Sequence, residues 1–101
     1  MSDTAEATIK IINKKGLHAR AAAKFVKTVG MFEVHILVAK IAGAGVAAGG
    51  EAVEVSGGSI LGLMMLGAEC NSTLRLRASG AQAVKAVDAL RKLMEDKFGE
   101  E

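Results

Sequence analysis

Four segments of the chain have the alternation or the composition of β-strands. They are Ala7–Ile12, Glu33–Ala39, Ala52–Val55 and Thr73–Ala78. In the second segment Val34, Ile36 and Val38 share one face, which is the two-residue period of a strand with one buried side. His35 then points to the opposite face. The pattern predicts a sheet that is covered on one side only.

Two further stretches have the spacing of amphipathic helices. Ala19–Val29 repeats apolar side chains at helical intervals and places basic side chains on the other face. Gly30 is expected just past its end, in the left-handed region that glycine enters without steric cost. A longer helix is predicted after Ser79 and Gln82, which have the spacing of a capping box. Its expected apolar stripe consists of Ala83, Val84, Val87, Leu90, Leu93, Met94 and Phe98.

A short apolar segment, Ile60–Leu66, separates the third strand from the fourth. It is long enough for a helix of two turns that ends at Gly67. The predicted order is β-α-β-β-α-β-α, and strands with one buried face require helices on one side of a mostly antiparallel sheet. We therefore expect an α+β open-faced β-sandwich, with a four-stranded antiparallel sheet covered on one face by three helices. Residues 1–101 would form one domain, with polar tails at 1–6 and 99–101.

A glycine-rich stretch, Lys40–Gly50, is expected to be an extended, flexible loop between the second and third strands. Within it, Gly43–Ala48 has the spacing G-x-G-x-x-A of a dinucleotide-binding turn. Gly49 and Gly50 would break the helix that this motif requires, and no strand-helix-strand unit of about 30 residues follows. We therefore reject a dinucleotide site.

Composition narrows the classes of function. Half of the 101 residues are hydrophobic, and three Phe occur without Trp or Tyr, so the core must be aliphatic. A net charge of +2 is too small to define a nucleic-acid surface unless the positive groups cluster. The single cysteine, Cys70, allows neither an intrachain disulfide nor a zinc site, and no apolar run is long enough to span a membrane. Without a secretion signal, we expect a cytoplasmic protein that needs no metal or cofactor.

The strongest candidate for chemistry is His18, where the segment Gly16–Arg20 enters the first predicted helix. The first backbone N–H groups of a helix have no intrahelical partner and, together with the helix dipole, they favour an anion. Arg20 adds a planar cation that suits phosphate oxygens. Because much of an ordinary histidine is neutral at cytoplasmic pH, His18 can act as a nucleophile. The combination suits reversible phosphorylation; the alternative is that His18 only caps the helix.

Two blocks of sequence, Gly16–Arg20 and Val55–Gly67, resemble HPr, the histidine phosphocarrier family of the bacterial phosphotransferase system. The resemblance covers about residues 7–98. It implies that His18 accepts a phosphoryl group from phospho-enzyme I on its Nδ1 nitrogen and donates it to a histidine of an enzyme IIA domain. Arg20 would bind the phosphate, and phosphoenolpyruvate would be the ultimate donor. The chain would then be a monomeric carrier and not an enzyme.

By the same resemblance, Ser59 corresponds to the serine that an ATP-dependent HPr kinase phosphorylates in many bacteria. Its alternative role is to cap the helix that follows. Phosphate on Ser59 would add a charge of about −1.5 to −2 beside the apolar segment Ile60–Leu66. We expect this charge to weaken the docking of partners.

A docking surface with an apolar centre and a basic rim is expected near these sites. A two-turn helix this apolar cannot bury every side, and methionine adapts to several partners. The expected docking residues are Leu17, Lys24, Lys27, Ile60, Leu63 and Met64. The alternatives are core positions for the apolar residues and a solvated helix face for the lysines.

The chain departs from the family pattern at two places. Ala21 stands where family members usually have proline, whose fixed φ suits the first helical turn. Losing that rigid turn is expected to cost roughly 0.4–1 kcal/mol through the unfolded state, while the helix itself should form. The loop Lys40–Gly50 is also longer than the usual connection, and its role is open.

Three other functions are considered beside the phosphocarrier. A nitrogen-related branch of the same family uses the same chemistry to report metabolic state, and the sequence does not separate it from sugar uptake. A small nucleic-acid-binding module is disfavoured because strands without Tyr or Trp offer little base stacking. An autonomous hydrolase is disfavoured because the motif around His18 contains no acid or nucleophile partner.

Overall fold

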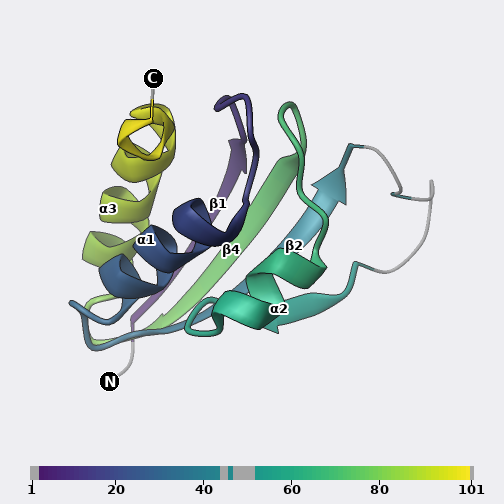
Figure 1. Ribbon diagram of the computed structural model, residues 1–101. Helices are drawn as coiled ribbons and strands as arrows, with labels where there is room; N and C mark the ends of the chain where they lie inside the picture. Colours follow the sequence, from purple (N-terminus) through teal and green to yellow (C-terminus); the bar gives the residue numbers. More distant parts are fainter. Residues whose placement is uncertain (1–2, 44–45, 47–51, 101) are drawn as a thin grey trace.

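The strands form one open antiparallel sheet in the order β1-β4-β2-β3 (Figure 1). The computed structural model describes residues 3–43, 46 and 52–100. Three helices lie on one face of the sheet, and a 3-10 turn follows the last of them. The elements are β1 (Asp3–Lys10), α1 (Ala19–Val29), β2 (His35–Ala42), β3 (Glu54–Ser56), α2 (Ile60–Met65), β4 (Thr73–Gly80), α3 (Ala83–Glu95) and η1 (Lys97–Gly99). The predicted open-faced sandwich and its order of elements are confirmed.

The core lies between the helices and the covered face of the sheet. Leu76 of the central strand β4 pairs with Ala7 of β1 on one side and with Val38 of β2 on the other, and all three side chains are buried. Phe25 of α1 and Leu90 of α3 are fully buried against this face. The two-residue alternation therefore correctly identified the buried side of the sheet.

Several expected strand boundaries are wrong by one to four residues, and two of these shifts change the expected tail and loop. Residues 3–6, expected in a polar tail, belong to β1, where Asp3 is paired with Gly80. Their polar side chains are compatible with a strand because one face of this sheet is open. β2 continues through Lys40 to Ala42, so the expected loop begins later, and residues 44–45 and 47–51 lie outside the described part. The rejected dinucleotide motif falls largely on those residues.

The expected capping box before α3 is also wrong. Ser79 is still part of β4, and Gln82 occupies the N-cap position without a side-chain cap. The Gln82 Oε1 atom instead accepts a hydrogen bond from the Glu33 backbone N–H, at 2.8 Å. The Gln82 side chain, which was expected to cap the start of α3, therefore links that start to the segment before β2.

The helix ends differ from expectation at single residues. Gly30 caps α1 with a right-handed φ of −66°, so the expected left-handed conformation is wrong there, whereas Gly67 follows α2 with a φ of +62°. Val84 is 56% exposed and does not belong to the apolar stripe of α3, and Ala86 is buried in that helix instead. Phe98 is buried as expected, but in η1 and not on a continued α3.

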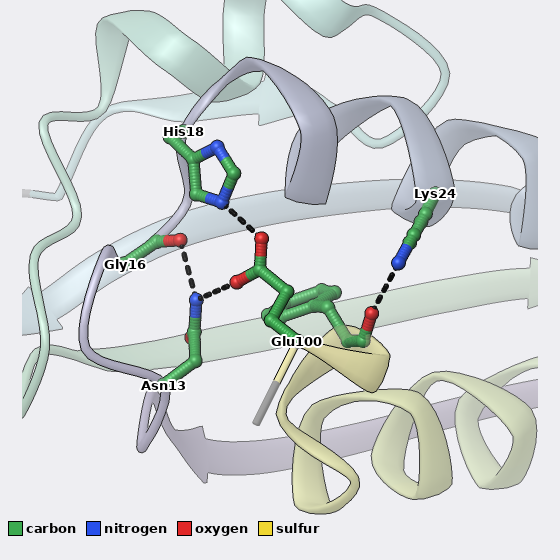
Figure 2. A network of polar contacts seen from close by, with 6 residues as sticks. Asn13, Gly16, His18, Lys24 and Glu100 are labelled. Carbon is green, nitrogen blue, oxygen red and sulfur yellow. Dashed lines mark hydrogen bonds and ion pairs between the residues drawn. The ribbon is translucent and has the colours of Figure 1, made fainter.

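A tight backbone reversal follows α3. Lys97, Phe98 and Gly99 all have φ between 55° and 72°, a left-handed conformation that costs a non-glycine residue roughly 1–2 kcal/mol. Such strain persists where the surroundings over-determine it. Here the Phe98 ring is buried in the core and its carbonyl oxygen accepts a hydrogen bond from Lys24 Nζ. The reversal carries Glu100 to the start of α1 (Figure 2), so the expected tail 99–101 is wrong for its first two residues.

Candidate functional site

The turn before α1 is closed by close backbone contacts. Gly16 N–H donates to the Asn13 carbonyl at 3.1 Å, and Leu17 N–H donates to the Ala68 carbonyl at 2.8 Å. Gly16 has a φ of +67°, and a Cβ there would lie only 2.6 Å from the Ala68 carbonyl oxygen. Glycine is thus required where two chain segments meet, and their contact fixes the point at which α1 begins after His18.

His18 occupies the N-cap position of α1, with extended backbone and no side-chain cap. The Ala22 N–H donates to the His18 carbonyl at 2.8 Å, which leaves the N–H groups of the first turn without intrahelical partners. The His18 side chain is 28% exposed, so another protein can reach it. Ala21, in place of the family's usual proline, is fully buried, and the helix still forms from Ala19.

Arg20 lies on the first turn of the same helix and is exposed. Within the described residues, no hydrogen bond or ion pair holds its guanidinium. The structure therefore places the two expected phosphate-site residues, His18 and Arg20, at one end of α1. Both are accessible to a ligand from solvent.

Glu100 supplies a contact that the sequence did not predict. The His18 Nε2 atom donates to Glu100 Oε2, and Asn13 Nδ2 donates to Glu100 Oε1 at 2.9 Å (Figure 2). The same Asn13 amide donates to the Gly16 carbonyl at 2.8 Å. Asn13 is fully buried, so the end of β1, the start of α1 and the C-terminal reversal are joined beside the histidine ring.

The Glu100 carboxyl is held in its ionised form. Burial raises its pKa, but the hydrogen bonds from Asn13 and His18 and the positive charges of His18 and Lys15 lower it more. The net pKa lies below the ordinary value of 4.5. Because an ionised carboxylate only accepts hydrogen bonds, the proton between the two groups belongs to His18 Nε2. In a neutral ring Nδ1 then keeps its lone pair, and Nδ1 lies on the side of the ring away from Glu100 (Figure 2).

Known proteins are similar to this chain over nearly its whole described length. The family model described as "PTS HPr component phosphorylation site" matches residues 5–96. The chain belongs to the HPr family. It is similar to the phosphocarrier protein HPr of Neisseria meningitidis serogroup A, with 40% identity over 93 residues that cover 92% of this chain and 93% of the relative. The HPr of Treponema pallidum is 32% identical over 94 residues, which cover 93% and 96%.

Solved HPr structures share the fold. The structure of HPr-C-His from Thermoanaerobacter tengcongensis has a TM-score of 0.80 and 40% identity, covering 96% of this chain and 98% of that one. HPr from Bacillus anthracis has a TM-score of 0.76 and 26% identity, covering 90% and 96%. This HPr-family chain is accordingly a phosphocarrier of the phosphotransferase system.

Ser59 is the N-cap residue of α2. Its Oγ atom accepts a hydrogen bond from the Gly62 N–H at 3.0 Å, which satisfies one of the amides at the helix start. The capping role considered for Ser59 is therefore observed. Phosphorylation of this serine remains a prediction.

The expected docking residues divide into buried and exposed sets. Leu17 and Leu63 are buried in the core, so their expected exposure on a docking surface is wrong. Apolar side chains of α2 nevertheless cover the outside of that helix, because a six-residue helix buries only one of them, Leu63. The exposed ones, called here the α2 patch, are Ile60, Leu61, Met64 and Met65.

The two lysines expected at the basic rim differ in their surroundings. Lys27, in the last turn of α1, is exposed. Lys24 is half-buried, and its Nζ atom donates to the Phe98 carbonyl. Lys24 therefore ties α1 to the C-terminal reversal, whereas Lys27 remains at the surface.

The second histidine lies elsewhere. His35 is exposed on the open face of the sheet, as its strand position predicted, where it lines a hollow with Thr4, Glu6 and Arg77. In the described residues, no group of three or more His, Cys, Asp or Glu side chains could hold a metal ion. No helix in that part of the chain is long and apolar enough to cross a membrane.

Asn13 and Glu100 are the site residues that sequence reasoning missed. A signal existed for Asn13, because position 13 continues the two-residue series of buried positions at Ile9 and Ile11. A polar residue at a buried position of such a series is expected to make hydrogen bonds, since buried polar groups need partners. For Glu100 the only indication was the apolar Phe98 close before it, which shows that the chain still packs against the core there.

Proposed function

We propose that this HPr-family chain carries a phosphoryl group on Nδ1 of His18, accepting it from phospho-enzyme I and passing it to an enzyme IIA domain. Phosphoenolpyruvate is the ultimate donor, and both transfers take place in the cytoplasm. One observation carries the proposal. The partly exposed ring of His18 is held at Nε2 by Glu100, so the nucleophilic nitrogen of the neutral ring is Nδ1.

The transfer needs no proton to leave the ring. The Nδ1 lone pair forms the new N–P bond while the bond between phosphorus and the leaving group on enzyme I breaks and returns its electron pair to that group. The proton on Nε2 stays in place throughout. The step to enzyme IIA is the reverse, with the acceptor's histidine as the nucleophile and His18 as the leaving group.

The surroundings of His18 support phosphate binding. A phosphoryl group at this helix start would meet the first-turn N–H groups of α1, which have no intrahelical acceptors, and the positive end of the helix dipole. Arg20 can add paired N–H donors from its guanidinium. We therefore assign Arg20 to binding the phosphate.

The α2 patch supports the docking role. Its four apolar side chains are exposed on one short helix, and Lys27 of α1 supplies positive charge at the surface. Apolar contact with a basic rim fits partners that present acidic surfaces, whose charge complementarity speeds association. An HPr kinase that phosphorylates Ser59 would place negative charge at the start of α2, and this charge would slow docking more than it disturbs the helix.

The test is phosphorylation by enzyme I with labelled phosphoenolpyruvate. We expect one labelled site that is lost on acid treatment and stable in alkali, absent from His18→Ala and retained by the matched variant His35→Ala. Label should leave the protein when an enzyme IIA domain is added. A His18→Ala protein that is still labelled would overturn the assignment. Acceptors of the sugar type and of the nitrogen-related type, compared side by side, identify the branch by the faster transfer.

A further inference from the structure

We propose that Glu100, held by Asn13, is a positioning residue for phosphotransfer at His18. It keeps the ring in the Nε2-protonated form and stabilises the positive charge that the ring gains when Nδ1 bonds to phosphorus. This inference rests on the proposed function and extends it to a residue near the end of the chain.

The first support is a continuous set of contacts that begins in the backbone. Asn13 is fully buried, and both protons of its amide have acceptors, the Gly16 carbonyl at 2.8 Å and Glu100 Oε1 at 2.9 Å. The amide is therefore fixed by the turn before α1. With Oε1 held by Asn13, the second carboxylate oxygen, Oε2, lies against His18 Nε2 (Figure 2). One carboxylate is thus oriented at both of its oxygens.

The second support is the way in which Glu100 reaches the site. The left-handed turn Lys97–Gly99 reverses the chain, the Phe98 ring is buried, and Lys24 binds the Phe98 carbonyl. The Glu100 side chain is only 12% exposed, against 28% for His18. The carboxylate is thereby held in a partly dry position before any partner binds, so orienting it costs little during transfer.

The third support is the charge balance of the reaction. A neutral ring with a proton on Nε2 becomes a cationic ring once Nδ1 shares its lone pair with phosphorus. A carboxylate at Nε2 strengthens its hydrogen bond as this charge develops. The acid of a serine-protease triad acts on its histidine in the same way, fixing the tautomer and stabilising the imidazolium. Because both transfers pass through the same ring state, Glu100 should assist both.

The experiment compares Glu100→Gln with Glu95→Gln. The second variant removes the same charge from an exposed position on α3 and is the matched control. The first readout is the ¹⁵N spectrum of the His18 ring in alkaline solution, where the ring is neutral. Wild type and control should show the proton on Nε2, whereas Glu100→Gln should show a mixture of tautomers, because an amide can donate as well as accept.

The second readout is the rate of phosphorylation by enzyme I. We expect kcat for Glu100→Gln to fall roughly tenfold, the effect of losing one charge-assisted hydrogen bond, with KM close to that of the control. Asn13→Ala, which removes the donor that holds Oε1, should shift the tautomers and kcat in the same direction. A carboxylate with a purely structural role would lower stability without moving the tautomers.

The outcomes separate this inference from the proposed function. If wild type takes no label on His18, the phosphocarrier assignment fails. If wild type is labelled but Glu100→Gln matches the control in tautomer or in kcat, the role of Glu100 is overturned. The tautomer measurement needs no partner protein, so it decides the first half of the inference even for a variant that docks poorly.

Discussion

The helices α1 and α2 both have an N-cap residue that is expected to accept phosphate, and the two helix starts are built differently. At α2, Ser59 Oγ accepts a hydrogen bond from Gly62, three residues further along. At α1, His18 makes no side-chain cap, and its ring is held instead by Glu100, 82 residues away in the sequence. One start is supported locally and the other from the far end of the chain.

The difference matters for the chemistry of each site. At α2 the serine oxygen already satisfies an amide of the first turn, so this helix start is complete without a ligand. At α1 the first-turn N–H groups can still donate hydrogen bonds to an incoming anion, because the His18 side chain does not cap the helix. A carrier that must bind and release phosphate benefits from the second arrangement.

The largest expected effect comes from removing the buried ring of Phe98, which holds the turn that brings Glu100 to His18. Phe98→Ala should lower the free energy of unfolding by about 3–5 kcal/mol, because it empties a buried aromatic site. It should also release Glu100 and mix the tautomers of His18. Urea unfolding measures the first effect and the ¹⁵N spectrum the second. Val84→Ala, at an exposed position of α3, is the control and should change both very little.

A smaller effect is expected from removing Arg20, the side chain that we assign to binding the phosphate. Arg20→Ala should slow phosphorylation by enzyme I roughly tenfold, since it removes charge-assisted hydrogen bonds to the phosphate oxygens. Arg91→Ala removes the same charge from an exposed position on α3 and should leave the rate unchanged. Equal rates for the two variants would show that Arg20 does not contact the phosphate.

The local support at α2 can be removed separately. Ser59→Ala should cost about 1 kcal/mol of stability, the usual value of an N-cap, and should leave the labelling rate at His18 as it is. Ser59→Asp keeps a capping oxygen but adds charge beside the α2 patch, so it should accept phosphate more slowly. A Ser59→Asp protein that is labelled at the unmodified rate would refute the proposed regulation.

The smallest effect is a pH dependence at Glu100. Its pKa is lower in the folded state than its ordinary value of 4.5, so it contributes stability above that pH and loses the contribution as the pH falls through the lower, folded value. Wild type should therefore be more stable than Glu100→Gln near neutrality, and the gap should close in acid. Urea unfolding at a series of pH values measures the gap; a gap that widens below pH 4 would contradict the sign.

Features encoded by neighbouring residues could be predicted from the sequence. The alternation in β4 and the helical spacing of α1 are local, and α1 was predicted with its observed bounds. His18, Arg20 and Ser59 were identified because a helix start and its residue types lie within a few positions of one another. The α2 patch was predicted only in part, since spacing alone did not show that Leu63 would be the buried side chain.

The features that failed depend on distant partners. Ser79 and Gln82 match a capping box, but β4 continues through Ser79 because it pairs with β1 and β2 on both sides. Gln82 accepts a hydrogen bond from the backbone N–H of Glu33, which lies just before β2 and 49 residues earlier in the sequence. Glu100 reaches His18 through a left-handed turn that no local residue pattern announced, since two of its three residues are not glycine.

The strand order has a consequence for the synthesis of this chain. β1 ends at Lys10, whereas β4, the strand with which it pairs, begins only at Thr73, so β1 is translated well before its partner. The apolar face of β1 stays uncovered until a segment distant in the sequence is made. Contacts between such distant segments form late and slowly in folding. Glu100 follows even later. A nascent chain therefore cannot assemble the complete histidine site before Glu100 has been translated, although His18 is made early.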